Sequence, residues 1–291
     1  MAAYYWRAYR ILHIGGIGAI LLLLILSGFV IPKSDYAAEK TEEVKKEIIV
    51  IEDAAVPKAK KEALLILPGL GDSNRGRRHQ KRYFTNRGYD LFIPDFKDRK
   101  SIEATVLKLE KFFFDNHLDE YKKVHVFSYI MGSWVLNKFI QKNGRLNIAS
   151  IVYDRSPLQE RAPRVIAERI PLIGTIAVGK VVIDMSNMTY PSIEKEDLRI
   201  GILVESRATP LIKLFRKRTL SYGDIDWHTL DFQQKYDDLI YIPLNHDEMY
   251  LRFDVVGHDI LHFIETGEFT KDSRRIPYDW DAFKTQKEEK W

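Results

Sequence analysis

The sequence contains no cysteine. This absence excludes disulfide bonds, catalysis by a thiolate and metal sites built on cysteine ligands. The net charge is also small, at +4 for 291 residues, so the overall charge gives no indication of a nucleic-acid partner. With 45% apolar and 30% charged residues, the composition is that of a globular domain of ordinary size, and we expect no cofactor and no metal.

Charged residues are also absent from one long stretch near the N-terminus, between Ile11 and Ile31. At about 1.5 Å per residue, a helix over this run would be about 30 Å long, enough to cross the hydrocarbon core of a bilayer. A cleaved signal peptide is the alternative, but the cut near "SDYAAEK" would place Asp35 or Tyr36 where a small residue is needed. We therefore predict an uncleaved single-pass transmembrane anchor over residues 1–32.

The charges around this segment predict its orientation. Arg7 and Arg10 precede it, which favours an N-terminus on the cytoplasmic or matrix-like side and the large domain on the opposite side of the membrane. Lysines that follow the segment closely weaken this asymmetry. The bilayer is thus an expected partner, and glycines at 15, 16 and 18 leave open the approach of a helix from another subunit of a membrane complex.

Beyond a charged tether and leading strand over residues 33–62, apolar runs alternate with helical patterns. Runs of the kind found in buried strands occur at 63–69, 89–96, 123–129, 147–154, 199–206 and 238–244. Such alternation predicts an α/β fold with a mainly parallel, doubly wound sheet. Residues 157–197 interrupt the alternation and are expected to form a helical cap inserted into a domain that spans 63–272, and a polar C-terminal tail follows over 273–291.

The stretch "KVHVFSYIMGSW" (123–134) joins a β-branched run to a helix through a tight turn. A nucleophile elbow has this form, with the reactive residue at its centre and small residues two positions before and after. Centred on Ile130, the small positions are Ser128 and Gly132, whereas centring on Ser128 puts valine and isoleucine there. The centre is therefore Ile130, which has no proton to lose and no lone pair with which to attack.

From about residue 63 to 269 the chain resembles the α/β-hydrolase family. The motifs that carry the resemblance are "LLILPGLGDS", "VHVFSYIMGS" and "LIYIPLNHDEMYLRFDVVGHDILHFIETGEF". The resemblance implies that His246 holds the position of the catalytic histidine and that the amides of Leu70 and Met131 form the oxyanion hole. Ala208 stands where the family's acid is usual.

The resemblance leaves the acid of the triad open. Glu205 lies too early in the sequence to replace Ala208 comfortably, while Asp154 matches members that take the acid from the preceding strand. An ion pair with Arg155 or another neighbour is the alternative role for Asp154, and a surface position is the alternative for His246. A triad works as a unit, so His246 and Asp154 are expected to be vestigial at best.

Two further patterns can each be explained by a functional role or by an ordinary structural one. Basic residues crowd the segment after the first central strand, where no acid occurs between Asp72 and Asp90: Arg75, Arg77, Arg78, Lys81 and Arg82. They form either a solvated helix face or a patch for an anionic lipid or protein. His258 and His262 have the spacing of a zinc motif, but we expect them to lie on the final amphipathic helix without metal.

These observations favour a membrane-anchored α/β-hydrolase-like protein that is non-catalytic and serves as a binding or assembly component. One alternative is an active hydrolase of esters, lipids or peptides that uses water activated by His246. The other is a purely structural subunit of a membrane complex. An open, ligand-sized pocket beneath the cap would separate the first interpretation from the third.

Overall fold

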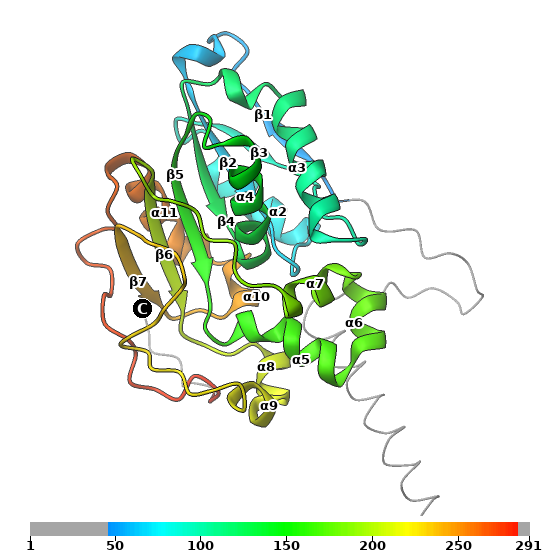
Figure 1. Cartoon of the computed structure of the whole chain (residues 1–291). Coiled ribbons are helices and arrows are strands. Elements are labelled where there is room, and N and C mark those ends of the chain that lie inside the picture. Colours follow the sequence, from blue (N-terminus) through cyan, green and yellow to red (C-terminus); the bar gives the residue numbers. More distant parts are fainter. Residues whose placement is uncertain (1–45, 285–291) are drawn as a thin grey trace, which may run out of the picture.

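The computed structural model describes residues 46–284. A seven-stranded sheet lies at its centre in the order β1-β3-β2-β4-β5-β6-β7, and Figure 1 shows helices on both of its faces. The strands are β1 (Ile49–Ile51), β2 (Glu62–Leu67), β3 (Asp90–Ile93), β4 (Lys123–Ser128), β5 (Ile148–Arg155), β6 (Arg199–Glu205) and β7 (Asp238–Ile242). All neighbours pair in parallel except β1, which runs antiparallel to β3.

The sequence therefore predicted the strands and the mainly parallel sheet correctly. Continuous apolar runs became the central strands because helices cover them on both faces. The leading strand β1 pairs in the opposite direction because the chain reaches β2 through a short connection instead of a crossover helix.

The principal α-helices follow the strands in alternation. They are α2 (Asn74–Phe84), α3 (Ile102–Asp115), α4 (Ile130–Asn143), α5 (Ala162–Arg169), α6 (Pro171–Val178), α7 (Val181–Asn187), α8 (Pro210–Leu214), α9 (Arg216–Leu220), α10 (His246–Met249) and α11 (Phe253–Thr266). Short 3₁₀ turns occur at Lys58–Lys60, Leu118–Glu120 and Gln159–Arg161. The interruption at 157–197 contains α5, α6 and α7, which form the cap at one end of the sheet (Figure 1).

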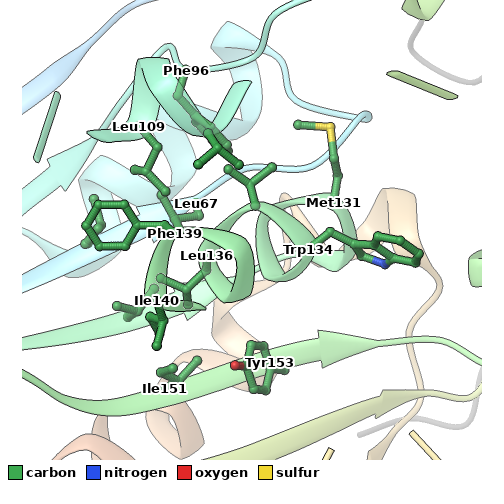
Figure 2. Close-up of a cluster of buried hydrophobic side chains, with 14 of the residues drawn as sticks. Leu67, Phe96, Leu109, Met131, Trp134, Leu136, Phe139, Ile140, Ile151 and Tyr153 are labelled. Carbon is green, nitrogen blue, oxygen red and sulfur yellow. The ribbon is translucent and has the colours of Figure 1, made fainter. Parts of the chain in front are cut away.

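Two apolar clusters hold the helices to the sheet. On one face, α3 and α4 pack on the strands, and Figure 2 shows Ile140 of α4 next to Ile151 of β5, with Phe139 of α4 toward Leu109 of α3. On the other face, α2 and α11 pack through residues such as Phe84 and Ile260. The parallel strands keep their carboxyl ends together, so the loops and helix starts after β2, β4, β5, β6 and β7 meet at the edge where the cap lies.

The chain ends contribute differently to this domain. The predicted anchor, residues 1–32, and the tether up to residue 45 lie outside the described residues, as do residues 285–291. Over residues 46–284, no helix is long and apolar enough to cross a membrane. The segment that begins at 273 is polar in sequence but packs in part, since Ala282 is buried and its carbonyl accepts a hydrogen bond from the Ala208 amide (2.9 Å).

Candidate functional site

Three ionisable side chains meet at the carboxyl edge of the sheet. Asp154 comes from the end of β5, Glu205 is the last residue of β6, and His246 is the first residue of α10, after β7. His246 Nδ1 lies 2.7 Å from Glu205 Oε1 and 3.4 Å from Asp154 Oδ2. Both acids are fully buried and the histidine is 5% exposed, so the cluster is sealed from bulk water on its acid side.

The position of His246 is fixed by the local sequence. Asn245 forms a capping box with Glu248 at the start of α10: the Asn245 side chain accepts hydrogen bonds from the amides of Asp247 and Glu248, and the Glu248 side chain accepts one from the Asn245 amide. Such a box sets where a helix begins. The first helical residue, His246, is thereby turned toward the ends of β5 and β6.

The structure places both candidate acids beside His246, so the sequence interpretation was wrong only in setting Glu205 aside. Glu205 is not too early, because the ends of β5 and β6 are adjacent in the sheet and place both carboxylates beside the same ring. Asp154 does not pair with Arg155. The Arg155 guanidinium binds Glu160 instead (2.5 Å) and lies over the ring of Tyr190 (4.1 Å). Neighbouring residues of one strand point to opposite faces, so Asp154 and Arg155 diverge.

Ala208, at the usual acid position, lies elsewhere. It is buried in a small apolar cluster with Leu158, Ile212 and Ala282. A carboxylate there would have no polar environment. The acid closest to the histidine is three residues earlier, at the very end of β6.

The surroundings of the cluster raise the pKa values of both His246 and Glu205. Burial opposes protonation of His246, but the negative charge of Glu205 and the close approach of both acids to the ring outweigh it, so the pKa of His246 is raised well above its usual value. Burial, reinforced by the charge of Asp154, raises the pKa of Glu205 well above its usual value too. Both shifts favour the protonated forms of His246 and Glu205.

The same three residues are the group whose ligand atoms, within 4.8 Å of one another, could hold a metal ion among residues 46–284. Three carboxylate oxygens in it have no hydrogen-bond partner in the structure: both of Asp154 and Oε2 of Glu205. A single proton shared between the two acids would satisfy only two of these three oxygens. His258 and His262 lie on α11 as expected, with ring centroids 6.3 Å apart, and are not part of such a group.

The turn between β4 and α4 does not have the strained backbone conformation of a nucleophile elbow. Tyr129 caps α4 with φ −72° and ψ 168°, Ile130 is its first residue, and no residue of this turn has a positive φ. A small residue two positions after Ile130, at Gly132, is nevertheless required. A Cβ on Gly132 would lie 2.4 Å from the Leu67 carbonyl oxygen, so only glycine lets α4 approach β2 this closely.

The three residues of the turn face different surroundings. Ser128 is fully buried at the end of β4 and makes only a 3.3 Å contact with its neighbour's carbonyl. Tyr129 points toward the histidine, with ring centroids 6.2 Å apart. Ile130 packs into the apolar cluster beneath α3 and α4 and borders a pocket below the cap.

Tyr129 is not a substitute nucleophile. Its hydroxyl donates to the Met249 carbonyl (3.2 Å) and accepts from Gln80 (3.1 Å), and its ring stacks on Tyr250 at 4.1 Å. Burial, and next the charge of Asp154, raises the pKa of Tyr129 well above 10. The phenol therefore stays neutral and fully hydrogen-bonded at physiological pH.

In the loop after β2 that matches the oxyanion loop, only some backbone amides are hydrogen-bonded within the protein. The Gly69 amide donates to the Tyr250 hydroxyl (3.0 Å), and a Cβ at Gly69 would lie 3.6 Å from Nε2 of His246. Neither the Leu70 nor the Met131 amide has a hydrogen-bond acceptor within residues 46–284. The second ring nitrogen of His246 thus faces a glycine-lined loop that retains donor groups.

A pocket of about 380 Å³ lies between this turn and the cap. Its wall mixes apolar and aromatic side chains with charged and polar ones. The apolar and aromatic residues are Ile130, Trp134, Pro163, Met185, Met188, Tyr190, Tyr222 and Phe232, and the charged ones are Arg155, Glu160, Arg161, Arg164 and Asp231. Arg155 and Arg161 are held by internal partners: Arg161 donates to the carbonyls of Thr219 and Gly223.

The basic segment after β2 is divided by the fold. Arg77 is 1% exposed, pairs with Asp72 (2.8 Å) and donates to the Ile93 and Pro94 carbonyls, so it does not belong to a surface patch. It was predicted with the others because its spacing in the sequence does not distinguish the inner from the outer face of α2. The remaining four are exposed and have no carboxylate within 4.0 Å among residues 46–284: Arg75, Arg78, Lys81 and Arg82.

Comparisons with known proteins bear on the fold alone. No family model and no curated protein matches the sequence. The structure is similar to MGS-MChE2, an α/β-hydrolase enzyme from a sediment metagenome of the Mar Chica lagoon, Morocco (18% identity over 75% of this chain and 98% of that chain, TM-score 0.47). It is also similar to an α/β-hydrolase fold protein from Chitinophaga pinensis (12%, 76% and 98%, TM-score 0.46).

The structure is also similar to a lipase from Bacillus licheniformis, BlEst2, but this match covers less of both chains (13% identity over 60% of this chain and 79% of that chain, TM-score 0.42). At such identities likeness concerns the arrangement of strands and helices and says nothing about turnover. The seven-stranded, mainly parallel sheet with helices on both faces (Figure 1) is an α/β fold.

Proposed function

We propose that this chain is a non-catalytic α/β-hydrolase-like protein that binds a small ligand beneath its cap at a membrane. The observation that carries the proposal is the side chain at the apex of the β4–α4 turn. Ile130 offers an apolar wall to the pocket where a hydrolase needs a nucleophile. Neither serine of the turn replaces it, because Ser128 is fully buried and Ser133 donates to the Ile130 carbonyl inside α4 (2.7 Å).

The pocket supports binding over a purely structural role. Its volume of about 380 Å³ falls within the range of about 300–1,000 Å³ typical of small-molecule sites. A chain that served only as a scaffold would have no need to keep this space open, since side chains could fill it. Aromatic walls beside arginines and the acids Glu160 and Asp231 suit a ligand that combines apolar and polar groups.

The test has a covalent part and a binding part. Purified full-length protein is treated with a fluorophosphonate probe, next to an active serine esterase, and tryptic peptides that cover residues 127–133 are examined by mass spectrometry. We expect no adduct. A stoichiometric adduct on Ser128 or Ser133 would overturn the non-catalytic assignment.

The binding part uses anilinonaphthalene sulfonate, an apolar aromatic anion, as the probe. Ile130→Trp should fill the pocket and reduce probe binding, whereas a matched change at a distance, Ile276→Trp on the exposed surface, should not. Equal binding by the two variants would place the probe outside the pocket and remove the support for a ligand site.

An active hydrolase is the second candidate, and one observation favours it. The His246 ring is oriented by Glu205 at 2.7 Å, and its other nitrogen faces the loop with the free Leu70 and Met131 amides. A water held there could be activated if the ring were neutral. The raised pKa of His246 opposes this because an imidazolium cannot accept a proton. Ester turnover that His246→Ala abolishes and the exposed His258→Ala leaves intact would favour this second candidate.

The membrane location is part of the proposal and rests on the uncharged run between Ile11 and Ile31. We propose an uncleaved anchor, with the basic N-terminus on the cytoplasmic or matrix-like side. Resistance to alkaline extraction and a mature N-terminus near Met1 would support it, whereas an N-terminus between residues 30 and 40 would indicate cleavage.

Neutralising Arg75, Arg78, Lys81 and Arg82 together tests whether the outer face of α2 meets an anionic lipid or another subunit.

A further inference from the structure

The middle helix of the cap, α6, exposes an apolar face. Leu172 is 73% exposed and Ile176 is 65% exposed, and their i, i+4 spacing puts them side by side on one face of the helix. Gly174 and Val178 are buried on the opposite face. The helix PLIGTIAV contains no charged residue, so both of its faces are apolar, whereas an ordinary surface helix carries charges on its outer face.

This helix is held firmly in place. A Cβ on Gly174 would lie 2.1 Å from Ile166 Cγ2, so α6 packs closely on α5 at this point. At its other end, the Arg99 side chain donates to the carbonyls of Ile176 and Ala177, and the Lys180 amide donates to the Arg99 carbonyl (2.7 Å). Figure 1 shows α6 at the outer side of the cap, with α5 and α7 between it and the sheet. The apolar face is therefore part of the folded surface.

Positive charge borders this face at both ends. Arg169 lies just before α6 and Lys180 just after it; both are exposed and neither has a carboxylate within 4.0 Å among residues 46–284. The acid nearest in sequence, Glu168, is already bound by Arg164, Arg218 and Tyr222. An apolar strip between two free cations is complementary to an anionic lipid surface.

The start of the described chain lies at the same end of the molecule. β1 is antiparallel to β3, so it begins where β3 ends, and the Lys46 amide donates to Asp95 (3.3 Å). Asp95 is four residues before Arg99, which holds α6. Residues 32–45 join this point to the apolar N-terminal run, and a chain of that length spans at most about 50 Å.

We propose that α6 docks the cap on the anionic bilayer that holds the anchor. Leu172 and Ile176 enter the boundary between headgroups and acyl chains, and Arg169 and Lys180 meet lipid phosphates. This inference rests on the membrane attachment in the proposed function. A second copy of the chain fits the face less well, because two side chains provide far less than the roughly 800 Å² per partner of a stable interface, and a symmetric contact would bring like charges together.

The absence of cysteine makes a direct test possible. Leu172→Cys, Ile176→Cys and the control Ile276→Cys are made in the full-length chain and labelled with an environment-sensitive fluorophore. Ile276 is 65% exposed, as is Ile176, and it follows Arg275, which pairs with Asp238 at the start of β7, away from the cap. Each protein is reconstituted into phosphatidylcholine vesicles with and without phosphatidylglycerol, and with brominated lipids as quenchers.

We expect labels at 172 and 176 to shift their emission to the blue and to be quenched by brominated lipid, more strongly with phosphatidylglycerol, and the label at 276 to remain in water. Arg169→Gln combined with Lys180→Gln should remove the advantage of phosphatidylglycerol. Protein that floats with vesicles while both cap labels stay accessible to aqueous iodide would overturn docking and leave the anchor standing. Protein that fails to float would overturn the membrane attachment and docking together, while the pocket is tested separately by its own probes.

Discussion

The two sides of the candidate site differ in chemical character, since one is ionisable and the other is apolar. On the His246 side, three ionisable groups are buried together and held by short contacts. On the Ile130 side, the turn is apolar, unstrained and open to a pocket. A working triad requires both sides, because the histidine must take a proton from a nucleophile. The difference indicates that the polar side persists here for a structural reason.

A buried cluster of ionic groups can be retained because removing one member is costly. Taking away the cation leaves carboxylates without compensation in a low-dielectric interior, whereas taking away Ile130 leaves only a gap next to an existing pocket. The polar side of the site should therefore contribute more to stability than the apolar side does. Four changes test this comparison, from the largest expected effect to the smallest.

His246→Ala should destabilise the fold by about 3–5 kcal/mol, because Asp154 and Glu205 then lose the imidazolium that balances them. Urea unfolding monitored by circular dichroism measures the free energy of unfolding. The exposed His258→Ala is the control and should change it by less than about 0.5 kcal/mol. Equal, small effects of both variants would mean that the cluster is not a structural element.

Ile130→Ser should cost about 2–3 kcal/mol, since Ile130 is 5% exposed and packs in the larger apolar cluster. Relief of strain is not expected, because the residue adopts ordinary helical geometry. We predict little or no esterase activity for this variant, because the raised pKa of His246 opposes its action as a base. Adding Ala208→Asp should lower stability further without raising activity, because residue 208 lies in an apolar cluster. Robust esterase turnover by Ile130→Ser would show that only the nucleophile is missing.

Gly132→Ala should destabilise by about 1–3 kcal/mol, because the added Cβ would collide with the Leu67 backbone. Ser128→Ala, at the other small position of the turn, adds no atom and should cost less than about 1 kcal/mol. The same unfolding measurements apply. A Gly132→Ala protein as stable as Ser128→Ala would mean that α4 can move away from β2 easily, and that the turn is not constrained by this contact.

Counted per proton and per pH unit, the pH dependence of stability gives the smallest effect. The raised pKa of Glu205 means that the folded state binds a proton that the unfolded state releases above about pH 4.5. The raised pKa of His246 adds stability that is fully present below about pH 6.5 and is lost as the pH rises through its folded value. Both shifts make stability fall with rising pH, with a slope of at most about 1.4 kcal/mol per pH unit for each proton.

Glu205→Gln removes one of these protons and should flatten the fall between pH 5 and 8. The exposed Glu265→Gln on α11 serves as the control and should leave the slope unchanged. Melting temperatures recorded across this pH range measure the effect. An unchanged slope in Glu205→Gln would show that the acid is ionised in the folded protein, contrary to its raised pKa.

The sequence by itself determined the alternation of strands and helices, the place of the cap and the absence of a reactive group from the side chain at position 130. These features follow from local patterns: apolar runs form buried strands, and an isoleucine has no reactive proton wherever it lies. The spacing of Ser128 and Gly132 also identified the centre of the turn.

Only the tertiary structure decided which groups act together. Glu205 and Asp154 are 51 residues apart in the chain, and only the pairing of β5 with β6 brings both acids to His246. Likewise, sequence spacing could not separate buried Arg77 from its exposed neighbours, nor reveal that Leu172 and Ile176 face outward while Gly174 faces α5. Local pattern fixes which elements form, whereas burial and charge balance depend on what each element packs against.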